Sequence, residues 1–298
     1  MAGQSSGGFF RKIRILLLLY VLLMVACTAW LARARSTDWD DPLAVTIYPI
    51  NGDGSETTQD HIQSLSVLTF KEIEDFFNEE AERYGLALKT PVDIGLAPEI
   101  KEIPPPPPRN RTALSVMVWS LKLRYWSWSR DNYKYPKDIQ IFVLYFDPET
   151  RKTVAHSLGL QKGLIGIVNA FSSEKMDAEN NVVIAHELLH TVGATDKYEP
   201  RTNMPLYPIG YAEPELDPVL PQEYAEIMAG RIPINENKAE APRGLEETVI
   251  GEATAIEIRW LTGNYNLVKV ISHKLPARYK TRATPQATKH KLVTETLF

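Results

Sequence analysis

Residues 177–193 place two histidines and a glutamate on a single apolar helix. Apolar residues recur there at helical spacing, and Gly193 is the residue type that tolerates the left-handed conformation ending many helices. The helix contains His186-Glu187-Leu188-Leu189-His190. Because positions i and i+4 share one face of a helix, both imidazoles can bind one metal ion, with Glu187 beside a metal-bound water.

The segments before this helix predict a mixed β-sheet. Asp138–Phe146 is nearly continuous apolar sequence, which is typical of a central strand covered on both faces. Val154–Leu160 and Leu164–Ala170 are predicted to form a hairpin beside it, and Leu43–Ile50 alternates as a further strand does. These elements predict an α+β fold whose mixed sheet packs against the helix at residues 177–193.

Three further segments are predicted to be helical. Residues 58–86 have apolar residues at helical spacing, Ala113–Trp128 is a tryptophan-rich helix, and Glu246–Leu261 is a closing helix. The five prolines Pro104–Pro108 can only form an extended polyproline II segment. We interpret them as a surface loop within one domain, because neither flank is large enough to bury a core alone.

The helix motif extends into a longer pattern. Read from His186 through Gly193 to Asp196, it is HExxHxxGxxD, which resembles the HExxHxxGxxH signature of the metzincin clan of zinc metallopeptidases. Aspartate at the third position occurs in the snapalysin-like branch of that clan. Farther along, Glu226-Ile227-Met228-Ala229-Gly230 resembles the metzincin Met-turn. The resemblance covers about Asp138 to Gly230.

The resemblance implies a set of roles for these residues. His186, His190 and Asp196 would hold Zn2+, Glu187 would be the general base, and Met228 would lie under the metal. It also implies a metzincin-like metallopeptidase domain over residues 43–263, acting on a peptide or protein substrate. The edge of the predicted hairpin would pair with that substrate in extended form.

Several alternatives remain open at the level of sequence. Glu223 or Glu226 can replace Asp196 as third ligand, as a later glutamate does in gluzincins, and Met228 can be ordinary core filling. Gly230 stands where some metzincins have a tyrosine that stabilises the oxyanion, and the other candidates for that role are Tyr198, Tyr211 and Tyr224. His156 and the charged residues around the motif, Lys197 among them, are most simply structural or solvated.

Two functional alternatives also remain. The chain can be a binding or assembly module that keeps the fold without cleaving, although such a module has no need of a general base at position 187. It can also be a zinc hydrolase of a non-peptide amide, such as a cell-wall component, because the metal chemistry is the same.

The N-terminal region predicts a membrane anchor. Ile15–Ala32 is a run of eighteen uncharged, mostly apolar residues, just long enough to cross a bilayer as one helix. Basic residues flank it on both sides, and the short segment 1–14 is expected in the cytoplasm. Residues 33–42 would be a linker to a domain outside the cytoplasm, periplasmic or extracellular. A cleaved signal peptide and lipidation at Cys27 are the alternatives to this signal-anchor.

Composition narrows the remaining possibilities. With 44% apolar and 23% charged residues, the 298-residue chain has the profile of a globular protein. A formal net charge of -4 gives no reason to expect nucleic acid as a partner, and a single cysteine excludes an intrachain disulfide. Residues 264–298 carry seven Lys or Arg against one Glu, which predicts a basic, flexible tail.

Overall fold

A computed structural model of the chain describes residues 10–20, 23–24, 37–108, 110, 112–131, 133–160 and 163–261. Residues 10–20 and 23–24 are helical, whereas the other residues of the predicted span, 21–22 and 25–32, lie outside the described part. No helix within the described residues has the length and apolar character needed to cross a membrane. The predicted basic tail at 264–298 lies wholly outside the described residues.

A five-stranded sheet with the strand order β2-β1-β3-β5-β4 forms the centre of the fold. The strands are β1 (Leu43–Asn51), β2 (Val92–Leu96), β3 (Ile139–Phe146), β4 (Leu158–Leu160) and β5 (Ile165–Phe171). The first three and β5 run parallel, whereas β4 pairs antiparallel with β5 at one edge. The mixed sheet, the central position of β3 and the β4–β5 hairpin confirm the predictions, and β2 was not predicted.

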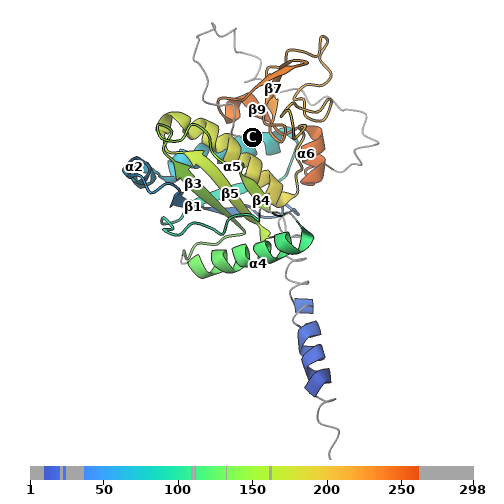
Figure 1. The fold of residues 1–298 in the computed structure, drawn as a ribbon. Helices are drawn as coiled ribbons and strands as arrows, with labels where there is room; N and C mark the ends of the chain where they lie inside the picture. Colours follow the sequence, from blue (N-terminus) through green and yellow to red (C-terminus); the bar gives the residue numbers. More distant parts are fainter. Residues whose placement is uncertain are drawn as a thin grey trace, which may run out of the picture.

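Helices cover both faces of this sheet. The long helix α5 (Asp177–Val192) packs on β5, whereas α4 (Ala113–Arg130) crosses the opposite face (Figure 1). The two helices between β1 and β2 are α2 (Glu56–Ser64) and α3 (Lys71–Arg83), and α3 packs against both β2 and α5. The predicted helices at residues 113–128 and 177–193 are thus confirmed.

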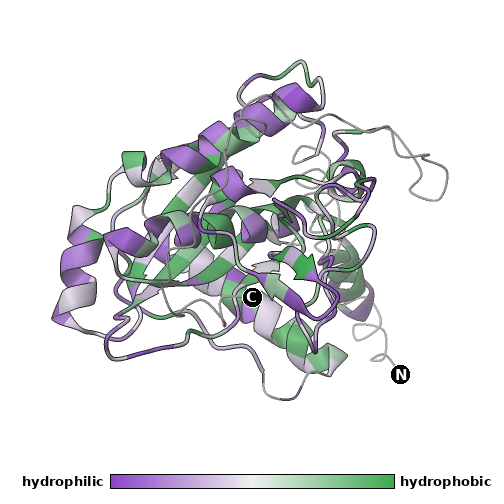
Figure 2. Ribbon diagram, turned by 90° about the horizontal axis from the view of Figure 1, so that it is seen from above, coloured by the Kyte–Doolittle hydropathy of each residue, from purple (hydrophilic) through white to green (hydrophobic). Residues whose placement is uncertain are grey.

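Most of the hydrophobic core is one continuous cluster that runs from Trp39 to Trp260, and Tyr224 and Val249 form a small second cluster. The rings of Trp39, Phe77 and Tyr84 all contact Trp260, so the start and end of the described domain pack together. Figure 2 shows the hydrophobic segments concentrated in the strands and helices at the centre, with more hydrophilic segments outside. The proline run lies beside α4, where the Trp119 indole donates a hydrogen bond to the carbonyl of Pro105.

The helix predicted over residues 58–86 is interrupted. After α2 ends at Ser64, Leu65 is extended, and the 3-10 helix η1 (Val67–Phe70) precedes α3. The interruption has a local cause, since the side chains of Ser66 and Thr69 form a reciprocal capping box at the start of η1. Hydroxyl groups here offer the backbone an alternative to a continuous helix, and apolar periodicity alone does not detect it.

The helix predicted over residues 246–261 is wrong for most of its length. This segment contains η4 (Leu245–Glu247), β9 (Thr248–Val249) and only a short helix, α6 (Glu252–Glu257). Strand β9 pairs with β6 (Ala225–Glu226), and this pairing holds the β-branched residues extended. The remaining small elements are η3 (Glu174–Met176) and the hairpin β7 (Ile232–Asn235) and β8 (Lys238–Glu240).

Asp177, the first residue of α5, is predicted to make folding stability depend on pH. Burial raises the pKa of its carboxyl to about 6. The folded state then binds the proton more tightly than the unfolded state. The free energy of unfolding is therefore unaffected below about pH 4 and decreases as the pH rises through 6. We expect Asp177→Asn to stabilise the protein by about 1 kcal/mol at pH 8, after allowance for solvent screening, and to have little effect at pH 4.

Urea denaturation of wild type and variant at the two pH values measures this difference. Asp60→Asn, at an exposed position on α2, is the matched control and should change stability equally at both. A stability difference for Asp177→Asn that does not vary with pH would contradict the assignment.

Candidate metal centre

The end of α5 turns the chain back toward its own histidines. His186 and His190 lie on one face with ring centroids 4.7 Å apart, and Gly193 caps the helix with a left-handed φ of 114°. The N–H of Ala194 donates to the carbonyl of Leu189 at 3.0 Å, which fixes the direction of the segment that follows. The predicted end of the helix and the reason for a glycine there are both confirmed.

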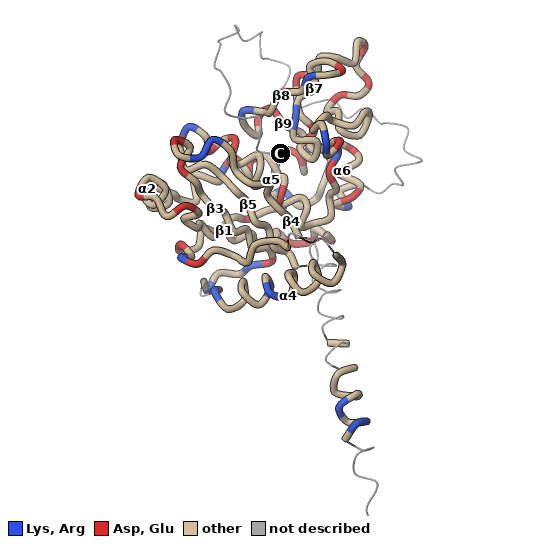
Figure 3. The backbone as a smooth tube through the Cα atoms, viewed as in Figure 1, with Lys and Arg blue, Asp and Glu red and all other residues tan. Residues whose placement is uncertain are grey.

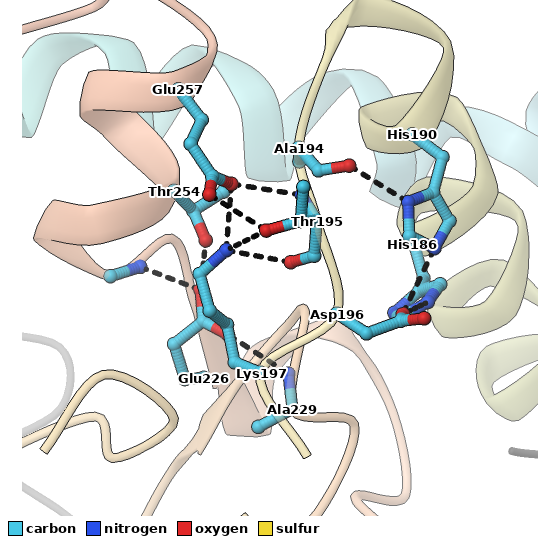
Figure 4. Close-up of polar contacts among 11 residues, drawn as sticks. His186, His190, Ala194, Thr195, Asp196, Lys197, Glu226, Ala229, Thr254 and Glu257 are labelled. Atoms are coloured by element: carbon cyan, nitrogen blue, oxygen red, sulfur yellow. Dashed lines mark hydrogen bonds and ion pairs between the residues drawn. The ribbon is translucent and has the colours of Figure 1, made fainter. Parts of the chain in front are cut away.

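This turn brings Asp196 to the two imidazoles. Its Oδ1 atom lies 3.3 Å from Nε2 of His186 and 3.0 Å from Nε2 of His190 (Figure 4). One ligand atom from each of the three residues lies within 4.8 Å of the others, so the group could hold a metal ion. The two histidines are largely buried, whereas the Asp196 side chain is 43% exposed, so the cluster is open to solvent on the aspartate side.

Backbone carbonyls hold the other nitrogen of each imidazole. Nδ1 of His186 lies 2.9 Å from the carbonyl oxygen of Ile227, and Nδ1 of His190 lies 2.9 Å from that of Ala194. In the tautomer that donates from Nδ1, each ring presents the lone pair of Nε2 toward Asp196. Such outer hydrogen bonds orient metal-binding histidines and raise their basicity.

The charges of the cluster favour a cation. Burial would raise the pKa of Asp196, but hydrogen bonds with His186 and His190 outweigh it and hold the pKa well below its usual range. Burial would likewise lower the pKa of His190, but the hydrogen bond with Asp196 and the nearby carboxylate of Glu187 raise it overall. A metal ion bound at this point would supply the positive charge that the Asp196 carboxylate favours.

Glu187 lies beside the cluster in a setting suited to a proton acceptor. The residue is 5% exposed, and its Oε2 atom is buried with no hydrogen-bond partner among the described residues. Burial raises the pKa of the carboxyl, while the neighbouring His186 and His190 and, more weakly, a hydrogen bond from the N–H of Gly159 oppose this shift. An unsatisfied buried carboxylate oxygen is costly, and a bound water or substrate group would satisfy it.

Strand β4 packs directly on α5 at this point, and only glycine fits at position 159. A Cβ atom there would lie 2.5 Å from Cβ of His190 and 2.6 Å from the carbonyl oxygen of Glu187. The absent side chain therefore lets the edge strand reach the glutamate. Sequence reasoning did not single out Gly159, and the only available signal was its position in the predicted hairpin.

Met228 lies in a tight turn that touches the segment after Asp196. The N–H of Ala229 donates to the carbonyl of Glu226 at 2.9 Å, which closes the turn, and the Met228 side chain is fully buried. The carbonyl of Met228 accepts a hydrogen bond from the N–H of Lys197 at 2.9 Å. The turn thus contacts the cluster through its backbone, including the Ile227 carbonyl oxygen 2.9 Å from Nδ1 of His186.

Lys197 is buried, which corrects the expectation that it is solvated. Its side chain is 2% exposed, and Nζ lies 2.6 Å from Oε2 of Glu257 on α6 and 2.7 Å from the carbonyl oxygen of Thr195 (Figure 4). The Glu257 carboxylate also accepts hydrogen bonds from the N–H and hydroxyl of Thr195. This network joins the segment that carries Asp196 to α6, and no local sequence pattern indicated it.

The two alternative third ligands lie apart from the histidines. Glu226 is fully buried and accepts hydrogen bonds from the N–H of Ala229, the N–H of Gly251 and the hydroxyl of Thr254. Glu223 is exposed, and neither glutamate belongs to the ligand cluster. The geometry therefore brings Asp196, and not a later glutamate, to His186 and His190.

Of the three candidate tyrosines, Tyr198 lies at the cluster. It forms a side-chain hydrogen bond with Asp196, and burial together with the charges of Asp196 and Glu187 raises its pKa to about 12. Tyr211 instead contacts the ring of Tyr207, and Tyr224 packs against Val249 away from the main core. His156 is exposed and lies outside the cluster, where its carbonyl accepts a hydrogen bond from Asn169.

No protein-family model matches the chain, and no curated protein matches its sequence. The class of the site therefore follows from its geometry: two helical histidines and a carboxylate that could hold a metal ion, beside a buried glutamate.

Proposed function

We propose that the protein is a membrane-anchored zinc peptidase of the metzincin type. The main support for the proposal is that ligand atoms of His186, His190 and Asp196 lie within 4.8 Å of one another, with the buried carboxylate of Glu187 beside them. Imidazole and carboxylate ligands suit zinc, and three protein ligands leave a position for water, as catalytic zinc sites require. The tight turn at Met228 and the left-handed Gly193 support the same assignment.

Each residue near the cluster has a distinct part in the proposed hydrolysis. Zinc, when bound, would polarise the scissile carbonyl and make an attacking water more acidic. Glu187 would take a proton from that water through its unpaired Oε2 and later pass it to the leaving amine. The Tyr198 hydroxyl, within reach of Asp196, would donate a hydrogen bond to the developing oxyanion.

The edge of the sheet supports a peptide as substrate. Strand β4 lies at the end of the strand order, and Gly159 in that strand contacts both Glu187 and His190. An extended peptide added to this edge would be held by backbone hydrogen bonds beside the general base. The apolar run Ile15–Ala32 would hold the domain at a membrane, on the side away from the cytoplasm.

Zinc content tests the metal assignment directly. We expect the purified full chain in detergent to bind close to one zinc ion per chain by elemental analysis, because three ligand atoms already lie together. The matched control is His156→Ala, which removes an exposed histidine outside the cluster and should leave the zinc content unchanged. Failure to bind zinc even after supplementation would contradict the proposal.

A further inference from the structure

Helix α4 has two apolar faces, and only one of them packs on the sheet. Trp119 and Leu123 are buried toward the domain, and the Trp126 ring contacts Phe142 of β3. Six large apolar side chains between 41% and 74% exposed lie on the other side, namely Leu114, Met117, Val118, Leu121, Tyr125 and Trp128. At 3.6 residues per turn, these six fall within an arc of about 100° that is centred opposite the buried side.

Basic residues border this outward face on both sides. Lys122 and Arg124 lie at its two margins by the same helical geometry, and α4 contains no Asp or Glu. The charge colouring in Figure 3 accordingly marks basic positions along α4 and no acidic one. An apolar stripe with tyrosine and tryptophan, bordered by lysine and arginine, is typical of a helix that lies in a membrane interface.

The proline run widens the apolar surface. Pro105, Pro106 and Pro108 line an open groove of about 560 Å³ together with Leu114 and Val118 of α4. Ile103, just before the prolines, is 56% exposed. The groove gives an acyl chain or headgroup a place beside the helix without any change in the core.

The position of α4 relative to the N-terminal segment argues for lipid rather than another occupant. The apolar run ends at Ala32 and the described domain begins at Thr37, so only residues 33–36 lie between them. Four residues span at most about 14 Å, which keeps the domain at the surface of any bilayer that the run enters. Figure 1 shows the helix of residues 10–20 on the side of the sheet that α4 covers.

We propose that α4 is an interfacial helix that docks the domain onto an anionic phospholipid surface. Its apolar arc enters the region between headgroups and acyl chains, while the exposed Lys122 extends to the phosphates. This docking would leave α5 and the metal cluster on the face of the sheet directed away from the lipid, where a soluble or surface-exposed peptide can reach β4. The inference rests on the membrane anchoring proposed above but not on the zinc chemistry.

Spin labels on the full chain test this docking. With Cys27→Ser as background, a nitroxide is attached at Leu121→Cys on the outward face or at Asn237→Cys in the exposed β7–β8 hairpin. Each protein is placed as a single chain in a nanodisc of phosphatidylcholine and phosphatidylglycerol. Continuous-wave spectra then report the accessibility of each label to oxygen and to a water-soluble nickel chelate.

We expect the label at position 121 to show several-fold lower nickel accessibility and higher oxygen accessibility than the label at 237. Adding Met117→Asp and Tyr125→Asp should reverse this difference, because carboxylates oppose entry into the interface. Water-like accessibility at position 121 in the nanodisc would overturn the proposal. Neither reading depends on zinc or hydrolysis, so a failure here is distinct from a failure of the proposed peptidase function.

Discussion

Glu187→Gln is expected to lower the rate of peptide hydrolysis by at least about a hundredfold while the zinc content stays unchanged. Glutamine preserves the size of the side chain and its hydrogen bond with Gly159 but cannot accept the proton of an attacking water. The structure supports this expectation, because Oε2 of Glu187 is buried and has no hydrogen-bond partner within the described residues, so it can accept a proton from a bound water. Hydrolysis of a peptide library, together with elemental analysis, measures both quantities.

Glu179→Gln is the matched control for this variant. Glu179 is also a partly buried glutamate on α5, but it lies outside the ligand cluster. Its replacement should leave the hydrolysis rate near that of wild type. If Glu187→Gln cleaved peptides as fast as wild type, the assigned mechanism would be wrong even if zinc were bound.

Asp196→Ala is expected to release the metal and abolish activity, because it removes one of three proposed ligands. Loss of a residue that only supports a ligand typically weakens metal binding about 10- to 100-fold. Zinc titration against a competing chelator separates these two outcomes. Glu223→Ala, at an exposed position, and Glu226→Gln, which keeps the shape of a buried side chain, should both retain the metal.

The glutamine at position 226 is chosen for a structural reason. Glu226 accepts hydrogen bonds from Ala229, Gly251 and Thr254, so alanine would leave buried donors unpaired and weaken folding. Stoichiometric zinc in Asp196→Ala together with an empty site in either glutamate variant would replace the proposed ligand set with a gluzincin-like one.

Sequence reasoning located the group of residues that could hold a metal ion because its signal is local. His186 and His190 are one helical turn apart, and Gly193 ends the helix three residues later, so a regular helix and a left-handed cap bring them to Asp196. Strands β3 and β5 were also predictable, since their apolar runs reflect burial on both faces, whereas β2 was not predicted. The predicted β4–β5 hairpin is also observed, although its edge strand β4 is not buried.

Apolar periodicity gave wrong predictions for two segments whose structure depends on specific hydrogen bonds. The helix predicted over residues 58–86 is broken by the hydroxyl groups of Ser66 and Thr69. Residues 246–261 do not form the predicted helix, because β9 within this segment pairs with β6, which lies earlier in the chain. Neither a local hydroxyl cap nor a distant strand partner changes the spacing of apolar residues.

From the sequence alone, the residues of the cluster and the mixed α+β fold could be predicted, because each depends on spacing within one helix or one strand. Only the tertiary structure decided that Lys197 is buried against Glu257, that Gly159 lets β4 reach Glu187, and that Glu226 supports the turn at Met228 and lies outside the ligand cluster. These contacts join residues up to 60 positions apart, as in the pair of Lys197 with Glu257. A sequence pattern predicts which face of a helix or strand is buried. The element that packs against that face depends on how the whole chain folds.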